Sequence, residues 1–569
     1  MRWERTAVVG IVLLAGVVVA VSGGSSDDPR TPPAILGLPP PFLGTAVLGD
    51  GELAAAVDAY GDIVDLRDGP VGAGLVDNPA ERQAAGTVPS ETGIVPRISI
   101  DGGPWLPLWR ADRVRQRYLP GTNVLRTTAR FGDAAVTIED AVRGRVLTRI
   151  VAVRGPAPRV RTSIGFEAGL GERLACRRRR LPSRLALSCW PIEALRSAPI
   201  PGSQNAQLPP STSRPATTVA AGGREDRRWL KRARPLGDGA PAWARKMYER
   251  SLLVLRALTD RRTGAVAAGL RDGWAYVWPR DAAAVSLALA AAGYRDEARK
   301  VAAFLSRLDL NAGARFDASG AAIEGREAQG DAWGWTAAAA GAAGLPPPAG
   351  RPDWHSLADY QEKSPGDYLG NALASTPRSA PESAATIQRL FGDRGVLARE
   401  ALPEATSASS QAGDSASEPD PATESDSDVD STAAWAVRPF TQPSLFAAAR
   451  RSLRQLIGSR GGRFGIVPSE DWPDEDPWTA PTAWTAWAFA ALSRRSSPAA
   501  RDVSAGSHAP NDRRAALELL ADLRRAATAA GMLPERVDAH TGVPRSTTPL
   551  AWSHAFAVLA LLELWPPNE

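Results

Sequence analysis

The segment Trp274–Asp281 (WAYVWPRD) combines residue types that suit the binding of a sugar. Three aromatic residues and the adjacent Arg280–Asp281 pair lie just before a long Ala-rich stretch. Aromatic rings cover the apolar faces of a pyranose, and a guanidinium and a carboxylate hold neighbouring hydroxyls bidentately. An Arg–Asp pair at a helix start is also found as a structural ion pair. The segment therefore predicts a sugar site only if other segments of the chain join it.

Three later segments repeat this combination of carboxylates and tryptophans at turns marked by Pro or Gly. They are Glu327–Trp335 (EAQGDAWGW), Ile466–Trp484 (IVPSEDWPDEDPWTAPTAW) and Leu533–Gly542 (LPERVDAHTG), the last followed by Pro549–His554 (PLAWSH). A carboxylate among indole rings has surroundings in which its pKa can rise far enough for acid–base catalysis. A purely structural helical scaffold does not explain why these residues gather in matching loops.

The composition allows two or three domains with a large core. It gives little sign of nucleic-acid, metal or nucleotide binding. The chain has 569 residues, 44% hydrophobic residues, 18 Trp and a net charge of only +5. The one dense basic run, Arg177–Arg180, lacks interleaved aromatics and is interpreted as a solvated hairpin, so no nucleic-acid partner is expected. The 4 His residues show no ligand spacing, and no phosphate-binding or dinucleotide motif occurs. We therefore expect no metal and no cofactor.

The first 22 residues are typical of an export signal. A charged start precedes the apolar run Ala7–Val21, which is shorter than the ~20 residues that span a bilayer comfortably. A signal peptide cleaved near Ala20–Ser22 and an uncleaved signal anchor both fit, so the protein is expected to be secreted or membrane-anchored with an extracytoplasmic catalytic domain. Residues 23–41 are predicted to form a stalk. In an oxidising compartment Cys176 and Cys189 are expected to form a disulfide, the alternative being two unrelated buried thiols.

The pattern of the remaining chain changes from strands to helices. Short alternating runs over residues 42–222 predict a β-sandwich, with strands near 57–66, 97–103, 135–140 and 147–153 and a loop over 201–223. Residues 223–240 are predicted to be a linker. From residue 241 the period is helical, with candidate helices at 241–258, 281–306, 331–343, 381–391, 441–457, 481–493, 512–530 and 550–564. Residues 402–433 are acidic and Ser-rich and are predicted to be a disordered insertion.

These motifs resemble glycoside hydrolase family 15, the family of glucoamylases, glucodextranases and some trehalases. The resemblance rests on Trp-Pro-Arg-Asp at 278–281, on Asp-Pro-Trp-Thr-Ala-Pro-Thr-Ala-Trp at 476–484 and on Gly-Asp-Gly-Glu-Leu at 49–53. Bacterial members of the family carry a β-sandwich before an (α/α)6 barrel. The resemblance thus implies a multidomain, β-then-α fold: an N-terminal β-sandwich followed by an (α/α)6 toroid, or six-hairpin barrel, over residues 241–569.

The resemblance also assigns roles to individual residues. Glu535 matches the general base that activates water. The substrate-binding residues are expected to be the hydroxyl clamp Trp278, Arg280 and Asp281, the second polar loop with Gln329 and Asp331, the cleft wall with Glu470, Asp471 and Trp478, and Trp552 at the start of the last helix.

The proton donor is less clearly marked, because the Trp-Glu pair common in the family is missing from the expected region. The nearest match is Asp359–Gly370, where Gln361 stands in place of Trp and precedes Glu362, which we predict to be the general acid. With Glu535 as base, the predicted reaction is inverting hydrolysis of an α-glucoside, with the two carboxyls roughly 6.5–9.5 Å apart. Starch-like chains, α-1,6 dextrans and trehalose are not separated by these residues. The alternative is a catalytically inactive member that binds glycan at the cell surface.

Overall fold

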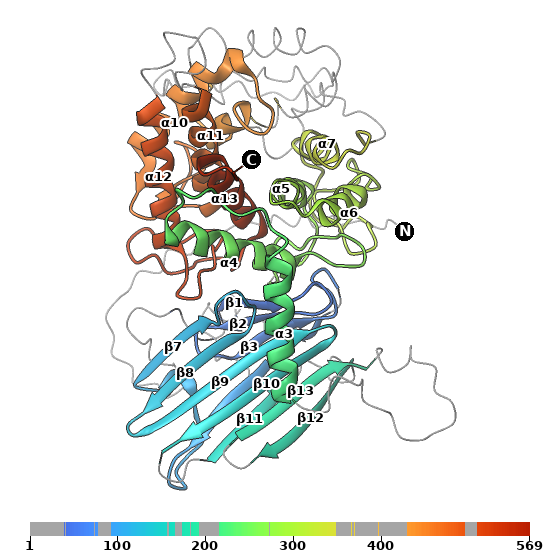
Figure 1. Cartoon of the computed structure of the whole chain (residues 1–569), viewed down its shortest axis with the longest axis vertical. Coiled ribbons are helices and arrows are strands. Elements are labelled where there is room, and N and C mark those ends of the chain that lie inside the picture. The colour runs from blue at the N-terminus through green and yellow to red at the C-terminus, as the bar shows by residue number, and fades with distance from the viewer. Residues whose placement is uncertain are drawn as a thin grey trace, which may run out of the picture.

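The computed structural model describes residues 39, 41, 43–72, 74–77, 93–155, 159–165, 173–181, 184–192, 215–271, 274–348, 366, 369, 396–397, 429–495 and 509–568. Two β-sheets made by the N-terminal part lie beside a helical part made by the rest (Figure 1). This β-then-α order agrees with the prediction. The predicted leader at 1–22 lies outside the described residues. No described helix has the length and apolar character that a bilayer span requires.

The β-rich part contains two antiparallel sheets among the described residues. In the seven-stranded sheet the order is β1 (Gly44–Gly49), β2 (Ala54–Asp58), β3 (Ile63–Arg67), β5 (Gly93–Ser99) and β11 (Arg159–Gly165), with β4 (Gly74–Asp77) beside β3 and β6 (Leu106–Pro107) beside β5. In the six-stranded sheet the order is β12 (Leu174–Leu181), β13 (Arg184–Pro191), β10 (Val146–Arg154), β9 (Ala134–Arg143), β8 (Leu125–Phe131) and β7 (Arg113–Tyr118).

The two sheets pack face to face through the residues that point inward. Ile98 of one sheet shares a core with Ile138 and Val151 of the other. Burial alternates along β8, as expected when one side of a strand faces a core. Arg149 is fully buried, is ion-paired with Asp140 at 2.7 Å and donates to backbone carbonyls of the opposite sheet. A buried guanidinium needs all these acceptors, so this group also fixes how the sheets sit on each other.

The hairpin of β12 and β13 carries a disulfide between Cys176 and Cys189, which face each other in the strand register. The basic run Arg177–Arg180 follows on β12, which is an edge strand, and its side chains are exposed. Charged side chains on an edge strand hinder pairing with another chain.

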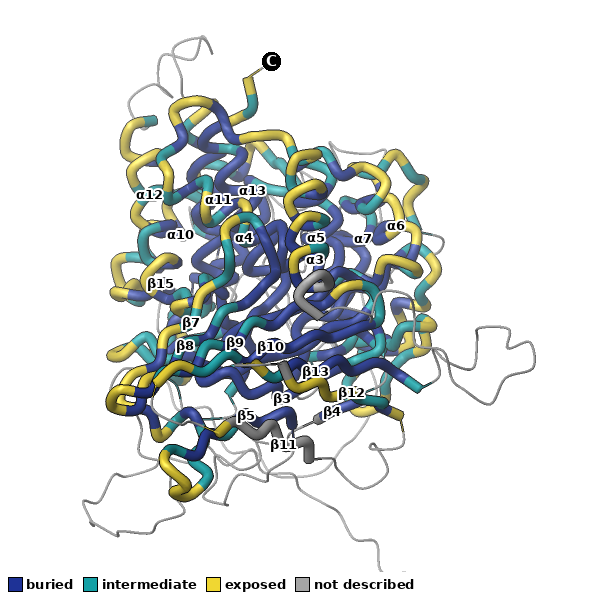
Figure 2. The backbone as a smooth tube through the Cα atoms, turned by 60° about the horizontal axis from the view of Figure 1, so that its bottom comes forward, coloured by how far each residue is buried: buried dark blue, intermediate teal, exposed yellow. Residues whose placement is uncertain are grey.

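The helical part is built around apolar helices that are almost wholly buried, seen as the dark segments of Figure 2. Helices α11 and α13 have buried residues on every side, and α13 packs against α4, α5 and α11. The helices are α3 (Pro215–Leu230), α4 (Ala242–Leu258), α5 (Pro279–Ala291), α6 (Arg295–Leu305), α7 (Ala332–Ala342), α10 (Phe446–Arg460), α11 (Thr479–Arg495), α12 (Ala509–Ala526) and α13 (Ala551–Leu564), with 3-10 turns η6 (Ser431–Ala436) and η7 (Pro443–Leu445). The described helices do not by themselves establish a closed toroid, and the predicted helix at 381–391 lies outside the described residues.

Among the predicted boundaries that differ from the structure, three have a clear physical reason. The helix predicted over 281–306 is two helices, because Gly293 has a positive φ of 94° that ends α5 and lets α6 turn back against it. Helix α3 occupies part of the predicted loop and linker, since Val219 and Trp229 give this Arg- and Ala-rich stretch an apolar face that becomes buried. The predicted insertion 402–433 extends too far, because residues 429–433 are buried and enter η6.

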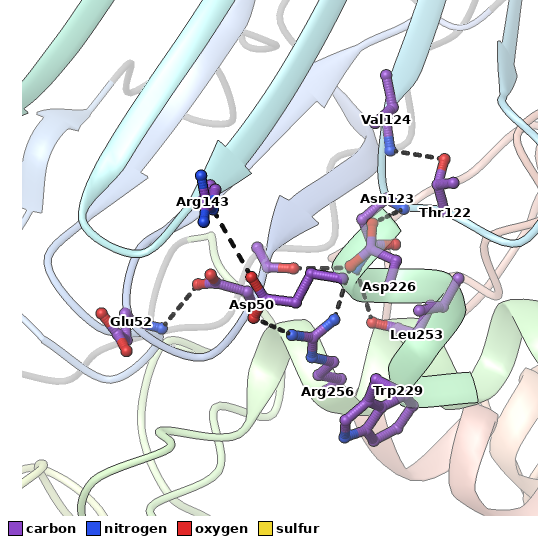
Figure 3. Close-up of polar contacts among 12 residues, drawn as sticks. Asp50, Glu52, Thr122, Asn123, Val124, Arg143, Asp226, Trp229, Leu253 and Arg256 are labelled. Carbon is purple, nitrogen blue, oxygen red and sulfur yellow. Dashed lines mark hydrogen bonds and ion pairs between the residues drawn. The ribbon is translucent and has the colours of Figure 1, made fainter. Parts of the chain in front are cut away.

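Polar contacts join the β-rich and helical parts (Figure 3). Asp226 on α3 accepts hydrogen bonds from Arg256 of α4 and from the backbone N–H of Asn123, both at 2.7 Å. The side-chain amide of Asn123 donates to the carbonyl oxygens of Gly49 and Leu253. These buried groups satisfy one another across the junction, so the sandwich is held at a defined place on α3 and α4.

Candidate active site

A cavity of about 830 Å³ lies where loops of the helical part meet. It collects residues from segments far apart in the sequence. Those that line it include Trp274, Trp278, Arg280, Asp281, Arg315, Arg326, Asp430, Trp435, Pro468, Ser469, Trp472, Trp478, Trp484, Glu535, Arg536, Ser546 and Trp552. Of the predicted site residues, Trp278, Arg280, Asp281, Trp478, Glu535 and Trp552 are therefore brought together.

Arg280 is held rigidly at the start of α5. Pro279 opens this helix and Trp278 precedes it, which places Arg280 and Asp281 in the first turn. The guanidinium donates to Asp331 Oδ2 at 2.7 Å, lies 3.6 Å from Asp281 Oδ2, and sits 4.1 Å from the ring centroid of Trp552. A guanidinium fixed on an aromatic face by two carboxylates is prepared to bind sugar hydroxyls without further ordering.

The second predicted loop supplies a buried partner for Arg280. Gln329 and Asp331 are both buried and neither lines the cavity. Asp331 acts on Arg280, as described above. That Gln329 and Asp331 bind substrate stays a prediction.

Glu535, in the segment Leu533–Gly542, is a buried carboxylate that also lines the cavity. Its side chain is 9% exposed, Trp274 Nε1 donates to its Oε1 at 3.2 Å, and the Ser546 hydroxyl donates to its Oε2. Burial raises the pKa of Glu535, while the hydrogen bonds from Ser546 and Trp274 and the charges of Arg536 and Arg280 oppose that rise. A general base works best when its pKa lies near the working pH, which is the direction in which burial moves this group.

The predicted cleft-wall residues Glu470 and Asp471 are absent from the cavity lining. Glu470 instead accepts hydrogen bonds from Ser459 at 2.6 Å and Gln455 at 3.3 Å, and Asp471 accepts one from Ser469. The neighbouring Trp472 lines the cavity in their place and packs edge-on against Trp478. The turn around Pro468 thus contributes an indole to the lining and not these carboxylates, which the order of residues alone does not reveal.

Several lining residues were missed by reading the sequence. Trp274 belongs to the aromatic segment 274–281, which the sequence marks as a candidate sugar site. Nothing in the sequence indicates that it donates to Glu535. Ser546 belongs to a polar loop without a motif. Asp430 lies inside the stretch 402–433 that was interpreted as a disordered insertion, and Trp435 lies just after it.

Asp281, Asp430 and Glu535 are the carboxylates that line the cavity among the described residues. Asp281 lies beside Arg280, and Asp430 accepts the backbone N–H of Thr432 at 2.7 Å as the cap of η6. Both carboxylates thus have structural partners. The predicted proton donor Glu362 lies outside the described residues. Within the described part of the chain, no cluster of His, Cys, Asp and Glu has the makings of a metal site.

Known proteins are similar to this chain in two ways. Residues 242–315, which contain the Trp-Pro-Arg-Asp segment, match the model of glycosyl hydrolases family 15. The predicted resemblance to family 15 is confirmed. No curated protein sequence matches the chain.

One of the solved structures with detectable similarity extends the likeness to the fold. A bacterial glucoamylase complexed with acarbose is 12% identical, with a TM-score of 0.61 over 92% of this chain and 94% of its own. A glucoamylase from Saccharomycopsis fibuligera is 13% identical, with a TM-score of 0.43 over 58% of this chain and 96% of its own. The family match supports a glycosyl hydrolase, as predicted, and the likeness to the bacterial glucoamylase shows a shared fold.

Proposed function

We propose that this protein is an exported, inverting glycoside hydrolase that releases glucose from α-glucosides. The observation that carries the proposal is the cavity itself. A buried glutamate with a raised pKa and a guanidinium fixed on an indole ring line the same tryptophan-rich space, although they come from segments more than 250 residues apart. The bacterial glucoamylase of similar fold binds acarbose. We propose a ligand of the same broad class, an oligosaccharide or disaccharide, for this cavity.

In the proposed reaction Arg280 and Asp281 hold hydroxyls of the terminal glucosyl unit while Trp278 and Trp552 cover its apolar face. Glu535 removes a proton from a water molecule that attacks the anomeric carbon. Glu362 protonates the departing glycosidic oxygen, so the bond to the leaving sugar breaks as the bond to water forms and the configuration inverts. The helices are proposed to complete an (α/α)6 toroid whose loops carry these groups, and the shared fold over most of the chain supports that arrangement.

Release of glucose from a panel of maltotriose, isomaltotriose and trehalose tests the proposal. The wild-type chain is expected to cleave at least one of them. Glu535→Gln should lower kcat/KM by about 10²–10⁴-fold, the usual contribution of a general base. Glu475→Gln, at an exposed glutamate outside the cavity, is the matched control and should leave the rate unchanged. No turnover of any substrate by the wild type contradicts the function, while equal turnover by Glu535→Gln contradicts the base assignment alone.

The proton donor is tested separately with an activated substrate. A 2,4-dinitrophenyl α-glucoside has a leaving group that needs no protonation. Glu362→Gln is therefore expected to lose activity on maltotriose and to keep most of it on the activated glucoside, whereas Asp430→Asn should affect both substrates alike. If the two variants show the opposite pattern, Asp430 is the donor and Glu362 is not.

Export is part of the proposal because of the apolar run at residues 7–21 and the disulfide between Cys176 and Cys189, a bond that persists mainly in oxidising compartments. Digestion of the protein by trypsin added outside intact spheroplasts tests it. Degradation without lysis is the expected result, and protection until lysis contradicts export. Recovery of the protein in the membrane pellet or in the medium distinguishes an anchor from a cleaved signal.

A further inference from the structure

His554 is a fully buried imidazole that the proposed reaction does not use. It lies in the first turn of α13, two residues after Trp552 of the cavity. Its Nε2 accepts the backbone N–H of Leu533 at 3.0 Å, and its Nδ1 lies 2.9 Å from the hydroxyl of Ser251 on α4. Because the Leu533 amide can only donate, Nε2 must be the unprotonated nitrogen and Nδ1 must carry the hydrogen that goes to Ser251.

The ring is thus held neutral, and its surroundings are consistent with that state. Burial and the nearby charge of Arg250 lower the pKa of His554 to about 3. A protonated ring would lose its acceptor and leave the buried Leu533 amide without a partner, so the neutral form and the hydrogen bond depend on each other.

Leu533 is two residues before Glu535, and the backbone between them is bonded at every step. The Thr479 hydroxyl contacts the carbonyl of Pro534 and lies 2.8 Å from the Ser553 hydroxyl. The carbonyl of Glu535 accepts the Thr479 N–H at 2.9 Å, and its own N–H donates to Thr547 at 3.0 Å. With both carboxylate oxygens bonded as well, the position of Glu535 follows from that of the backbone around it.

The β-sandwich reaches the same loop by two routes. On one, Arg250 of α4 donates to Asn123 and Thr122 of the sandwich, and the next residue, Ser251, contacts His554. On the other, the Thr528 hydroxyl donates to the carbonyl of Thr45 on β1 at 3.0 Å and accepts the N–H of Met532 at 3.2 Å. The two routes meet the chain at adjacent residues, Met532 and Leu533.

We propose that His554 and Thr528 are positioning residues for Glu535. Through these two residues the β-sandwich helps to hold the backbone that positions the catalytic base. This rests on the proposed function of Glu535. A misplacement of about 1 Å in a reacting group can cost roughly 10²-fold in rate. Since the base acts in the chemical step and the hydroxyl clamp around Arg280 stays intact, the loss should appear in kcat and not in KM.

Two pairs of variants test the proposal on the best substrate of the panel. His554→Leu removes the acceptor for Leu533 and should lower kcat at least tenfold with KM changed less than twofold, while His554→Gln keeps an acceptor and should recover most of the loss. Thr528→Val should lower kcat several-fold, and Thr528→Ser, which keeps the hydroxyl, should restore it. Tyr248→Phe is the matched control, because it removes a partly buried hydrogen bond of α4, to the Arg234 carbonyl at 2.8 Å, away from the Glu535 loop. It should lower Tm and leave kcat unchanged.

Amide hydrogen exchange of the peptide 528–536 gives a second readout that needs no turnover. His554→Leu and Thr528→Val are expected to speed exchange there, and Tyr248→Phe is not. Unchanged kcat and unchanged exchange in a folded His554→Leu variant overturn the proposal, as does a Gln variant no better than Leu. An inactive wild type contradicts the hydrolase function instead. The exchange data alone then show whether His554 and Thr528 hold the backbone around Glu535.

Discussion

The two sides of the cavity are built in different ways. On one side Arg280 is fixed by charges, with Asp281 beside it in the chain and Asp331 in the next helical loop. On the other side Glu535 is fixed by neutral donors, Trp274 and Ser546, and by the backbone around it. That backbone is bonded to Thr479 of α11, His554 of α13 and Thr528. His554 in turn contacts α4, and Thr528 donates to the sandwich. Charged clusters can be recognised as motifs in a sequence. A hydrogen-bond network of hydroxyls and backbone amides becomes visible only when the chain is folded.

The largest expected effect comes from breaking the charged side. Arg280→Met removes a cation that is paired with two buried carboxylates, and it should lower the free energy of unfolding by about 3–5 kcal/mol, the usual cost of breaking a buried pair. Arg536→Met is the comparison, because Arg536 pairs with Asp474 at 2.8 Å while both side chains are at least 35% exposed. A pair of that kind is typically worth less than about 1 kcal/mol. Urea denaturation followed by tryptophan fluorescence measures both, and equal losses would contradict the asymmetry.

Removal of the disulfide should affect stability without affecting the cavity. The bond joins residues 13 positions apart, and opening a loop of that size costs about 3 kcal/mol in the chain-entropy account. We expect Cys176→Ser with Cys189→Ser to lower the denaturation midpoint of the sandwich and to leave KM unchanged for the folded protein. A large rise in KM would mean that the hairpin influences the cavity, which the contacts described here do not predict.

A smaller effect is expected on the neutral side. The Ser546 hydroxyl stabilises the ionised form of Glu535, so Ser546→Ala should raise the pKa of Glu535 further. The base is active when ionised, and activity falls as pH drops through its pKa. The acid limb of the profile of kcat/KM should therefore move to higher pH, by up to about one unit, which corresponds to roughly 1.4 kcal/mol. A limb that moves to lower pH contradicts the assignment of this limb to Glu535, and Ser459→Ala, which acts on Glu470 outside the cavity, should not move it.

The sequence predicted the parts of the molecule that depend on local pattern. Alternating strands, the helices and the clamp at 278–281 follow from periodicity and from residue types at a helix start. The split after Ala291 was missed because one glycine between an apolar and a charged stretch does not show which way the chain turns. The sequence did not show that Glu470 and Asp471 lie outside the cavity lining, because the fold of the turn around Pro468 decides which of several neighbouring side chains lines the cavity. Ser546, His554 and Thr528 carry no motif, since a hydroxyl or a neutral imidazole acquires its role only from distant partners.

The stereochemistry of the released sugar tests the central claim most directly. ¹H NMR of the wild-type reaction on the best α-glucoside, recorded before mutarotation equilibrates the anomers, shows which anomer of glucose is formed first. We expect β-glucose, because Glu535 directs water to the face opposite the leaving group. Initial release of α-glucose would mean that the configuration is retained, and Glu535 would then not be the base of a single displacement.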